Sequence, residues 1–343
     1  MRYLQRNNGG DRMHTKRQIT YREALREALY EEMRRDEQVI LMGEDVGLYG
    51  GGFRVTEGLL ERFGPERVLE TPISESAFVG AGIGAAVTGL RPVVELMFSD
   101  FMAVCWDQIM NEAAKMHFMY GGKLQTPIVI RSAAGGGTGA AAQHSQSLEA
   151  MYCHVPGLKV VVPSTAYDAK GLLKSAIRDN NPVIFLEQKL LYNERGVVPA
   201  GEYTIPLGKA DIKRKGEDVL VITYGRMVQE SILAAEKLAA EGIEAEVLDL
   251  RTLSPLDTDT IIREAGRIGR VVIVHESVQF AGFGGEISSL IMESEAFYQL
   301  KAPVQRLGGL YCPIPSSPVL EKAVFPDAER IEQTIRKVCT ATH

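Results

Sequence analysis

A glutamate at position 75 is the side chain best placed for proton-transfer chemistry. Glu75 ends the segment 71–75 (TPISE), which directly follows a short apolar run that predicts a buried strand. Ligands of parallel α/β folds bind at the carboxyl ends of strands, and the apolar neighbours Ile73 and Phe78 would shield the carboxyl group from water. Such a group is suited to exchanging a proton with a heteroaromatic nitrogen. The structural alternative is a carboxylate that balances a helix dipole at the N-terminus.

Two further positions carry polar groups that could act in a site. His144 follows the glycines at 135–137, and a loop histidine beside small residues can donate a proton or bind an anion, although such histidines are often simply solvated. Asp179 and Asn181 lie where an expected helix ends before Pro182. Oxygen ligands converging at such a turn can hold a monovalent cation. The structural alternative is a turn that satisfies the free carbonyls of the helix end.

Two glycine-rich stretches match nucleotide-binding loops without meeting their structural requirements. Residues 80–85 (GAGIGA) fit the pattern G-x-G-x-x-A but lie inside an expected helix, so no free helix N-terminus would face a pyrophosphate. Close helix packing explains these glycines better. Residues 281–285 (AGFGG) follow an expected strand but have no partner chemistry beside them, and we interpret His275 and Glu276 as structural. The sequence contains neither a Walker A loop nor a G-x-S-x-G elbow.

The elements that must position these residues alternate between short apolar strands and amphipathic helices. Thr20 and Glu23 form a capping box before the first helix. Strands with continuous apolar runs, separated by helices, indicate a parallel sheet covered on both faces. In the first part we expect strands at 39–42, 68–69, 92–98, 127–131, 158–162 and 182–187, and helices at 21–33, 77–89, 101–119 and 167–178. In the second part we expect strands at 218–224, 246–250, 270–275 and 304–307, and helices at 228–238, 256–265, 285–292 and 327–338.

The fold class is therefore α/β, with two parallel-sheet domains. Residues 17–198 would form the first domain and residues 208–343 the second, joined by a linker at 199–207 where proline and glycine cluster. Residues 1–16 are polar and basic, which favours a disordered extension over a transit peptide, and Met13 is an alternative start.

The composition is that of an ordinary globular protein. The 343 residues are 45% hydrophobic and 24% charged with a formal net charge of -6, and no basic stripe offers a footprint for nucleic acid. No run approaches the roughly 20 apolar residues of a membrane-spanning helix. The cysteines form no C-x-x-C pair, which favours free thiols in a reducing compartment. We therefore expect a cytoplasmic protein that binds neither nucleic acid nor membranes.

Several short motifs, in one order from about residue 17 to the C-terminus, resemble the beta subunits of the thiamin-diphosphate-dependent decarboxylating component of 2-oxo acid dehydrogenases. These motifs are 43–45 (GED), 71–75 (TPISE), 89–92 (GLRP), 142–145 (AQHS), 156–161 (PGLKVV), 168–173 (DAKGLL) and 179–182 (DNNP). The family includes pyruvate, acetoin and branched-chain 2-oxo acid dehydrogenases. The resemblance implies a transketolase-like pyrimidine-binding domain followed by a transketolase C-terminal-type domain. It also implies a heterotetramer of two alpha and two beta subunits with a beta–beta contact.

The resemblance also assigns roles to individual residues. Glu75 would hydrogen-bond the aminopyrimidine ring of thiamin diphosphate and promote its imino tautomer, and His144 would assist acyl transfer. Phe101 would stack on the pyrimidine. The remaining cofactor-binding positions would be Glu44, Ile73, Ser74 and Met97. A structural potassium ion would be held, largely by backbone carbonyls, at Ile128, Ala176, Ile177, Asp179 and Asn181.

One missing motif indicates that the site is shared with another chain. Thiamin diphosphate enzymes usually carry Gly-Asp-Gly followed by an asparagine pair roughly 25–30 residues later, because magnesium and the diphosphate need those oxygens. This sequence contains no Gly-Asp-Gly before Asn180 and Asn181, or elsewhere. We therefore expect the alpha subunit to hold magnesium and the diphosphate, which argues against a self-contained transketolase-like enzyme. A scaffold subunit without catalysis is the alternative of another class.

The substrate stays open among pyruvate, acetoin and branched-chain 2-oxo acids. The short segment 47–52 is like that of many pyruvate-type chains, whereas segments 95–98 and 224–228 are closer to acetoin-type chains. In either case the acyl group would pass to a lipoyl group, and the C-terminal domain would dock the lipoyl-bearing acyltransferase core.

Overall fold

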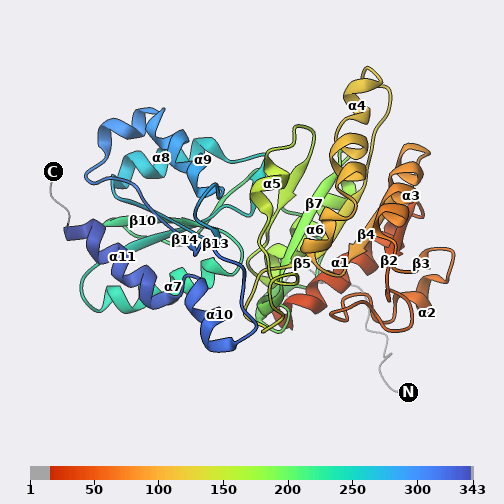
Figure 1. The fold of residues 1–343 in the computed structure, drawn as a ribbon, viewed down its shortest axis with the longest axis horizontal. Coiled ribbons are helices and arrows are strands. Elements are labelled where there is room, and N and C mark those ends of the chain that lie inside the picture. The colour runs from red at the N-terminus through yellow and green to blue at the C-terminus, as the bar shows by residue number, and fades with distance from the viewer. Residues whose placement is uncertain (1–15, 341–343) are drawn as a thin grey trace.

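The chain folds into two open sheets that lie side by side, each with helices on both faces (Figure 1). This computed structural model describes residues 16–340, so the expected N-terminal extension lies outside the described residues except for Lys16. Lys16 begins β1 (Lys16–Thr20), which pairs antiparallel with β8 (Arg195–Pro199). Within residues 16–340, no helix combines the length and the apolar content that crossing a bilayer requires.

The first sheet positions most of the candidate site. Its strand order is β12-β6-β7-β5-β4-β2-β3. Six of these strands run parallel, as the apolar runs predict: β2 (Val39–Gly43), β3 (Val68–Glu70), β4 (Arg91–Leu96), β5 (Val129–Ala134), β6 (Lys159–Val161) and β7 (Val183–Gln188). The edge strand β12 (Thr252–Ser254) is antiparallel and comes from the second half of the chain, which the sequence did not predict.

Helices cover both faces of this sheet and bury separate apolar clusters. On one face lie α1 (Tyr21–Arg35) and α6 (Ala166–Arg178), and on the other α3 (Glu75–Val87) and α5 (Glu149–Cys153). The capping box at the start of α1 is confirmed. Residues 80–85 lie inside α3, so their glycines do not form a phosphate loop.

The single helix expected over 101–119 is wrong. The segment consists of a 3-10 turn η1 (Ser99–Ala103), a π-helical stretch η2 (Gln108–Ala113) and a short helix α4 (Met116–Met119). Another short helix, α2 (Leu59–Phe63), lies earlier in the chain. The wide turn is visible where the amide of Ala114 donates to the carbonyl of Ile109 at 3.1 Å. Apolar periodicity does not reveal such changes of turn type, which often occur at functional sites.

The second sheet has the order β14-β13-β10-β11-β9. Its strands are β9 (Asp211–Arg214), β10 (Val219–Thr223), β11 (Ala245–Asp249), β13 (Val271–Val278) and β14 (Gln305–Gly309), of which only β9 pairs antiparallel. One face carries α7 (Met227–Ala239) and α11 (Ala328–Thr340), and the other α8 (Thr258–Ile268), α9 (Gly284–Met292) and η4 (Glu295–Gln299). The helix expected to begin at residue 256 begins at Thr258, because Asp257 caps it by accepting from the amide of Thr260.

The two halves share buried contacts. One apolar cluster continues from the first sheet, through residues such as Tyr152, to Leu220 and Ile287 of the second. Asp168 at the start of α6 also lies within 2.6 Å of Lys213 and 2.7 Å of Arg251. These contacts fix the relative position of the two sheets.

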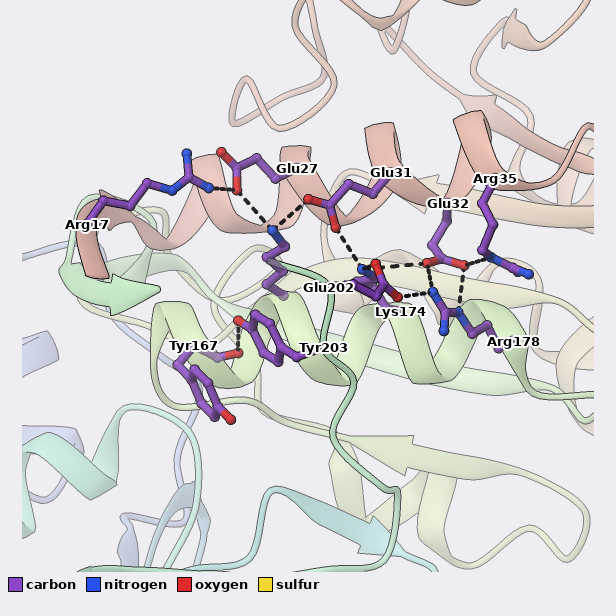
Figure 2. Close-up of polar contacts among 11 residues, drawn as sticks. Arg17, Glu27, Glu31, Glu32, Arg35, Tyr167, Lys174, Arg178, Glu202 and Tyr203 are labelled. Carbon is purple, nitrogen blue, oxygen red and sulfur yellow. Dashed lines mark hydrogen bonds and ion pairs between the residues drawn. The ribbon is translucent and has the colours of Figure 1, made fainter. Parts of the chain in front are cut away.

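The facing surfaces of α1 and α6 are joined by a network of ion pairs (Figure 2). The ammonium groups of Lys170 and Lys174, both on fully buried side chains, each lie 2.7 Å from a carboxylate oxygen of Glu31. Arg178 donates to both carboxylate oxygens of Glu32, at 2.9 and 2.6 Å. Buried charges are tolerated only when they are paired, so this network also fixes the register of the two helices.

His275 provides a pH-dependent contribution to stability. Its ring fits a slot where a side chain at Gly282, Gly284 or Gly308 would collide with it, and burial lowers its pKa to about 4. This structural role agrees with our interpretation of the sequence. An unfolded histidine has a pKa near 6.5, so the stabilising effect of the neutral ring is present above pH 6.5 and is lost as the pH falls to 4.

We therefore expect His275→Gln to flatten the pH profile of stability. Between pH 7 and pH 4, wild type should lose about 3 kcal/mol more unfolding free energy than the variant. Urea unfolding across this pH range measures the difference, and parallel profiles for the two proteins would show that His275 does not titrate in this way.

Candidate active site at the carboxyl edge of the first sheet

The candidate residues follow the carboxyl ends of neighbouring parallel strands. Glu44 comes directly after β2, Glu75 follows β3, Met97 and Phe101 follow β4, and His144 lies in the loop after β5. The chain passes from β2 to β3 on one side and then to β4 on the other side of β2. Open α/β sheets bind ligands outside the carboxyl ends of the strands at such a reversal, which here lies between β2 and β4.

Glu75 is the first residue of α3 and its side chain is buried. Ser74 precedes the helix but provides no side-chain cap, because its hydroxyl donates to the carbonyl of Pro72 at 3.0 Å. The carboxylate of Glu75 does lie at a helix N-terminus, as the structural alternative requires. Its burial beside the point where the strand order reverses is a feature that the helix dipole alone does not explain.

A second buried carboxyl group lies close to the first. Burial raises the pKa of Glu44, and the charges of Glu75 and Asp45 raise it further. The Oε1 atom of Glu44 is buried and has no hydrogen-bond partner among the described residues. An orphaned carboxyl oxygen inside a protein is costly, so it marks a place where a ligand with a hydrogen-bond donor would fit.

Aromatic rings bring His144 and Phe101 together. The ring centroids of these two residues are 5.3 Å apart, and Phe98 packs edge-on against both, at 4.7 Å from His144 and 5.8 Å from Phe101. Met97 packs closely against Gly52, where an added side chain would come within 2.6 Å of its sulfur. Met97, Phe98 and Phe101 thus form a half-buried apolar wall that also includes the imidazole of His144.

Hydrogen bonds tie the His144 loop to the turn that carries Phe101. The side chain of Gln146 donates to Asp100 at 2.8 Å, and its backbone carbonyl accepts from the hydroxyl of Ser99 at 3.2 Å. On the opposite side, the ammonium of Lys189 donates to the backbone carbonyl of His144. The position of the imidazole is therefore set from two sides.

One side of this site is open on the isolated chain. The side chain of Ile73 is 82% exposed and that of Val104 is 56% exposed. Val104 lies close to the start of α3, because the hydroxyl of Ser76 donates to its carbonyl at 2.7 Å, and Ile73 lies two residues before Glu75 in the chain. Ile73, expected from the sequence to line the pocket, thus faces solvent unless another surface covers it.

The five residues expected to hold potassium surround the end of α6, and most of their carbonyls already accept hydrogen bonds. Arg91 donates to the carbonyls of Ile177 and Asp179, at 2.9 and 2.8 Å. The carbonyls of Ala176 and Ile128 accept from the amides of Asp179 and Val183. Each of these carbonyl oxygens has two lone pairs, and one is already used by a hydrogen bond. A cation would therefore have to bind through the second lone pair of each carbonyl. The side chain of Asn181 donates to Asp179 at 2.9 Å.

Sequence reasoning missed several residues of this region. Phe98, Asp100 and Gln146 hold the expected residues in place, and Lys189 does so from the distant end of β7. The signal for Phe98 was present, since it ends an apolar run beside Phe101. No local signal indicated Lys189, because its partner is 45 residues away in the sequence.

Two family models cover most of the chain. Residues 17–195 match the transketolase pyrimidine binding domain, and residues 208–331 match the transketolase C-terminal domain. Among solved structures, a split-gene transketolase in an inactive beta4 tetramer superposes with a TM-score of 0.76 at 22% identity, covering 95% of this chain and 99% of that one. Transketolase from Leishmania mexicana gives 0.72 at 19% identity, covering 95% and 46%. At these identities, the likeness establishes the fold.

Curated relatives are considerably more similar. The chain is 50% identical to acetoin:2,6-dichlorophenolindophenol oxidoreductase subunit beta of Cupriavidus necator, over 94% of this chain and 97% of the relative. It is 49% identical to pyruvate dehydrogenase E1 component subunit beta of Rickettsia felis (94% and 98%) and 46% identical to 2-oxoisovalerate dehydrogenase subunit beta of Bacillus subtilis (93% and 98%). The chain therefore belongs to the transketolase-like family that contains the beta subunits of the pyruvate, acetoin and branched-chain 2-oxo acid dehydrogenases.

Proposed function

We propose that this chain is the beta subunit of a thiamin-diphosphate-dependent dehydrogenase that decarboxylates pyruvate or cleaves acetoin and transfers the acyl group to a lipoyl group. The observation that carries the proposal is the pair of buried carboxyl groups, Glu75 and Glu44, at the switch point of the first sheet. A buried acidic pair beside an apolar wall suits proton transfer to a heteroaromatic ring.

The residues present fit the pyrimidine half of the cofactor. The unpartnered Oε1 of Glu44 needs a hydrogen-bond donor, which an aminopyrimidine provides. The half-buried ring of Phe101 offers a stacking surface. Ile73, Ser74 and Met97 would complete the pocket. When bound, thiamin diphosphate supplies the electron sink for loss of the carboxylate carbon.

Glu75 would hold a proton at the pyrimidine ring nitrogen and so set the tautomer of the ring. Its burial at a helix N-terminus keeps water away and fixes the direction of the carboxyl group. His144, locked between Phe98 and Phe101, would give or take a proton during acyl transfer. The chain itself thus provides proton control and orientation.

The other half of the site would come from the alpha subunit. The exposed apolar side chains of Ile73 and Val104 beside Glu75 are consistent with a covering chain, and the missing Gly-Asp-Gly motif is consistent with magnesium held mainly by that chain. We propose a heterotetramer of two alpha and two beta subunits with a beta–beta contact, served by a lipoyl-bearing acyltransferase core. Residues 17–198 would form the pyrimidine-binding domain, 199–207 the linker and 208–343 the C-terminal domain.

We further propose a structural potassium ion at the end of α6, bound through the second lone pairs of the carbonyls of Ile128, Ala176, Ile177, Asp179 and Asn181. The carbonyls of Ile177 and Asp179 both accept from Arg91 and so lie close together, and this closeness supports the proposal. Melting the protein in potassium chloride should then give a higher midpoint than in equimolar sodium chloride. Equal midpoints across a titration of both salts would remove the proposal.

The experiment that tests the function is an assay of the co-purified assembly with its alpha subunit. Pyruvate, acetoin and branched-chain 2-oxo acids are supplied in turn, with thiamin diphosphate and magnesium, and reduction of 2,6-dichlorophenolindophenol is followed. We expect cofactor-dependent turnover of pyruvate or acetoin. Turnover of none of these substrates by a correctly assembled complex would favour the alternative of a scaffold subunit, and preference for branched-chain acids would correct the substrate.

A further inference from the structure

The glycine loop before His144 has the geometry of an anion-binding nest. Gly135, Gly137 and Gly139 adopt φ values of +83°, +91° and +69°, and the amides of Gly136, Gly137 and Gly139 all donate to carboxylates. Concave runs of backbone N–H groups bind anions in many proteins. In this chain, the anions that the amides contact are carboxylates of the C-terminal domain.

Two glutamates from the second half of the chain accept these amides. Glu321 receives the N–H of Gly137 on one carboxylate oxygen and that of Gly139 on the other, both at 2.8 Å. Glu276 receives the N–H of Gly136 at 2.7 Å. Hydrogen bonds from amides to carboxylates are about twice as strong as those between neutral groups. The bidentate contact from Glu321 fixes both peptide groups at once.

Both carboxylates are buried, which strengthens these bonds. Glu321 is 2% exposed and Glu276 is 3% exposed. Glu321 lies on α10 (Pro318–Val324), next to the first domain, and Glu276 lies on β13. Burial raises the pKa of Glu276, whereas Arg226 and the Gly136 amide lower it. Glu276 therefore interacts with the charge of Arg226 as well as with the loop. The principal polar contacts of the Glu321 carboxylate, among the described residues, are the two loop amides.

The loop packs closely against the segment that carries Glu321. A side chain at Gly136 would come within 2.2 Å of the Phe325 ring, and one at Gly137 within 2.4 Å of Leu190. Phe325 follows α10, so the same segment that carries Glu321 also closes over the loop. The glycines are required both for the backbone conformation and for this close approach.

The loop is continuous with the segment that carries His144. The amide of Gly135 donates to the carbonyl of Gln146 at 3.2 Å, which closes the loop on itself. Lys189 donates to the carbonyl of His144, and Gln146 is bound to Asp100. A displacement of residues 136–139 would therefore be transmitted to the imidazole. Only a small displacement is needed, since a shift of about 1 Å at a catalytic group can cost about 100-fold in rate.

We propose that Glu321 is a positioning residue for His144, through which the C-terminal domain sets the geometry of the acyl-transfer step. The inference rests on the proposed function for the role of His144. Glu321 acts through the backbone of the glycine loop and does not contact the reacting atoms. Glu276 supports the same loop from β13.

The test compares two half-reactions in the complete assembly with the alpha subunit. Dye reduction with 2,6-dichlorophenolindophenol reports the decarboxylating half, and acyl transfer to a lipoyl domain reports the half assigned to His144. Glu321→Ala should slow acyl transfer on the order of 10- to 100-fold and leave dye reduction within about twofold. Glu321→Gln, which keeps one acceptor oxygen, should recover part of the loss. The matched control is Glu293→Gln, an exposed glutamate at the end of α9.

A readout independent of activity is amide exchange in the apo assembly. The peptide covering residues 135–146 should exchange at least tenfold faster in Glu321→Ala than in wild type or in Glu293→Gln, because two amides lose their acceptor. Unchanged exchange, or equal slowing of both half-reactions, would overturn the proposal.

His144→Ala distinguishes failure of the role proposed for His144 from failure of the positioning role proposed for Glu321. If His144→Ala leaves acyl transfer unchanged, the role assigned to His144 under the proposed function is wrong. If His144→Ala slows acyl transfer but Glu321→Ala does not, the positioning inference alone is wrong. A double variant no slower than His144→Ala would show that both residues act through one group.

Discussion

Replacing Glu75 with glutamine should reduce the rate of the αβ assembly by about 100- to 10,000-fold, which is the usual contribution of a positioned acid–base group. The glutamine has nearly the same size and can still accept a hydrogen bond, but it cannot hold the proton that sets the pyrimidine tautomer. The buried site at the start of α3 should accommodate it without a change in fold. Initial rates of dye reduction with saturating cofactor measure the effect.

The matched control is Glu61→Gln, an exposed glutamate on the neighbouring helix α2. Its rate should equal that of wild type. A Glu75→Gln assembly that binds cofactor and keeps the wild-type rate would show that Glu75 serves only to balance the dipole of α3, and the scaffold alternative would then gain support.

Replacing Arg131 with methionine should destabilise the protein by about 3–5 kcal/mol, the usual cost of removing one partner from a buried ion pair. Arg131 on β5 donates to both carboxylate oxygens of Glu187, at 2.8 and 2.6 Å, and also to Glu95. Burial lowers the pKa of Arg131, but the two carboxylates outweigh this effect and raise it. Without the guanidinium, two carboxylates would be buried in the centre of the first sheet.

Denaturant unfolding monitored by circular dichroism measures this loss. The comparison is Arg54→Met, which removes an exposed ion pair with Glu57 and should cost less than about 1 kcal/mol. Replacing Arg131, Glu95 and Glu187 together with apolar residues should restore most of the stability, because no unpaired charge remains. Equal losses of unfolding free energy in Arg131→Met and Arg54→Met would show that the buried ion pairs of Arg131 contribute no more to stability than an exposed pair does.

Much of the first domain could be predicted because its signals are local. The apolar runs of β2 and β7 are buried on both faces, and the capping box before α1 involves residues three positions apart. Glu44 and Glu75 could be placed at one edge of the sheet because Glu44 directly follows one strand and Glu75 lies in the short loop after the next. Their closeness depends on strand order, which the parallel topology restricts to few arrangements.

The rest could not be predicted because it depends on contacts between distant segments. Glu276 and Glu321 bind glycine amides 140 and 184 positions away. The edge strand β12 belongs to the second half of the chain but completes the first sheet. The π-helical turn after Phe101 arises from packing of Ile109 and Ala113 into the core, which overrides the apolar period of an ordinary helix.

The most direct test of the account is calorimetric titration of thiamin diphosphate and magnesium into this chain, first alone and then with its co-purified alpha subunit. We expect binding only in the mixture, because our proposal assigns Glu75 and Glu44 to the pyrimidine half of the site and the diphosphate half to the other chain. Tight binding to the isolated chain would contradict it, since the diphosphate would then have a site within this chain.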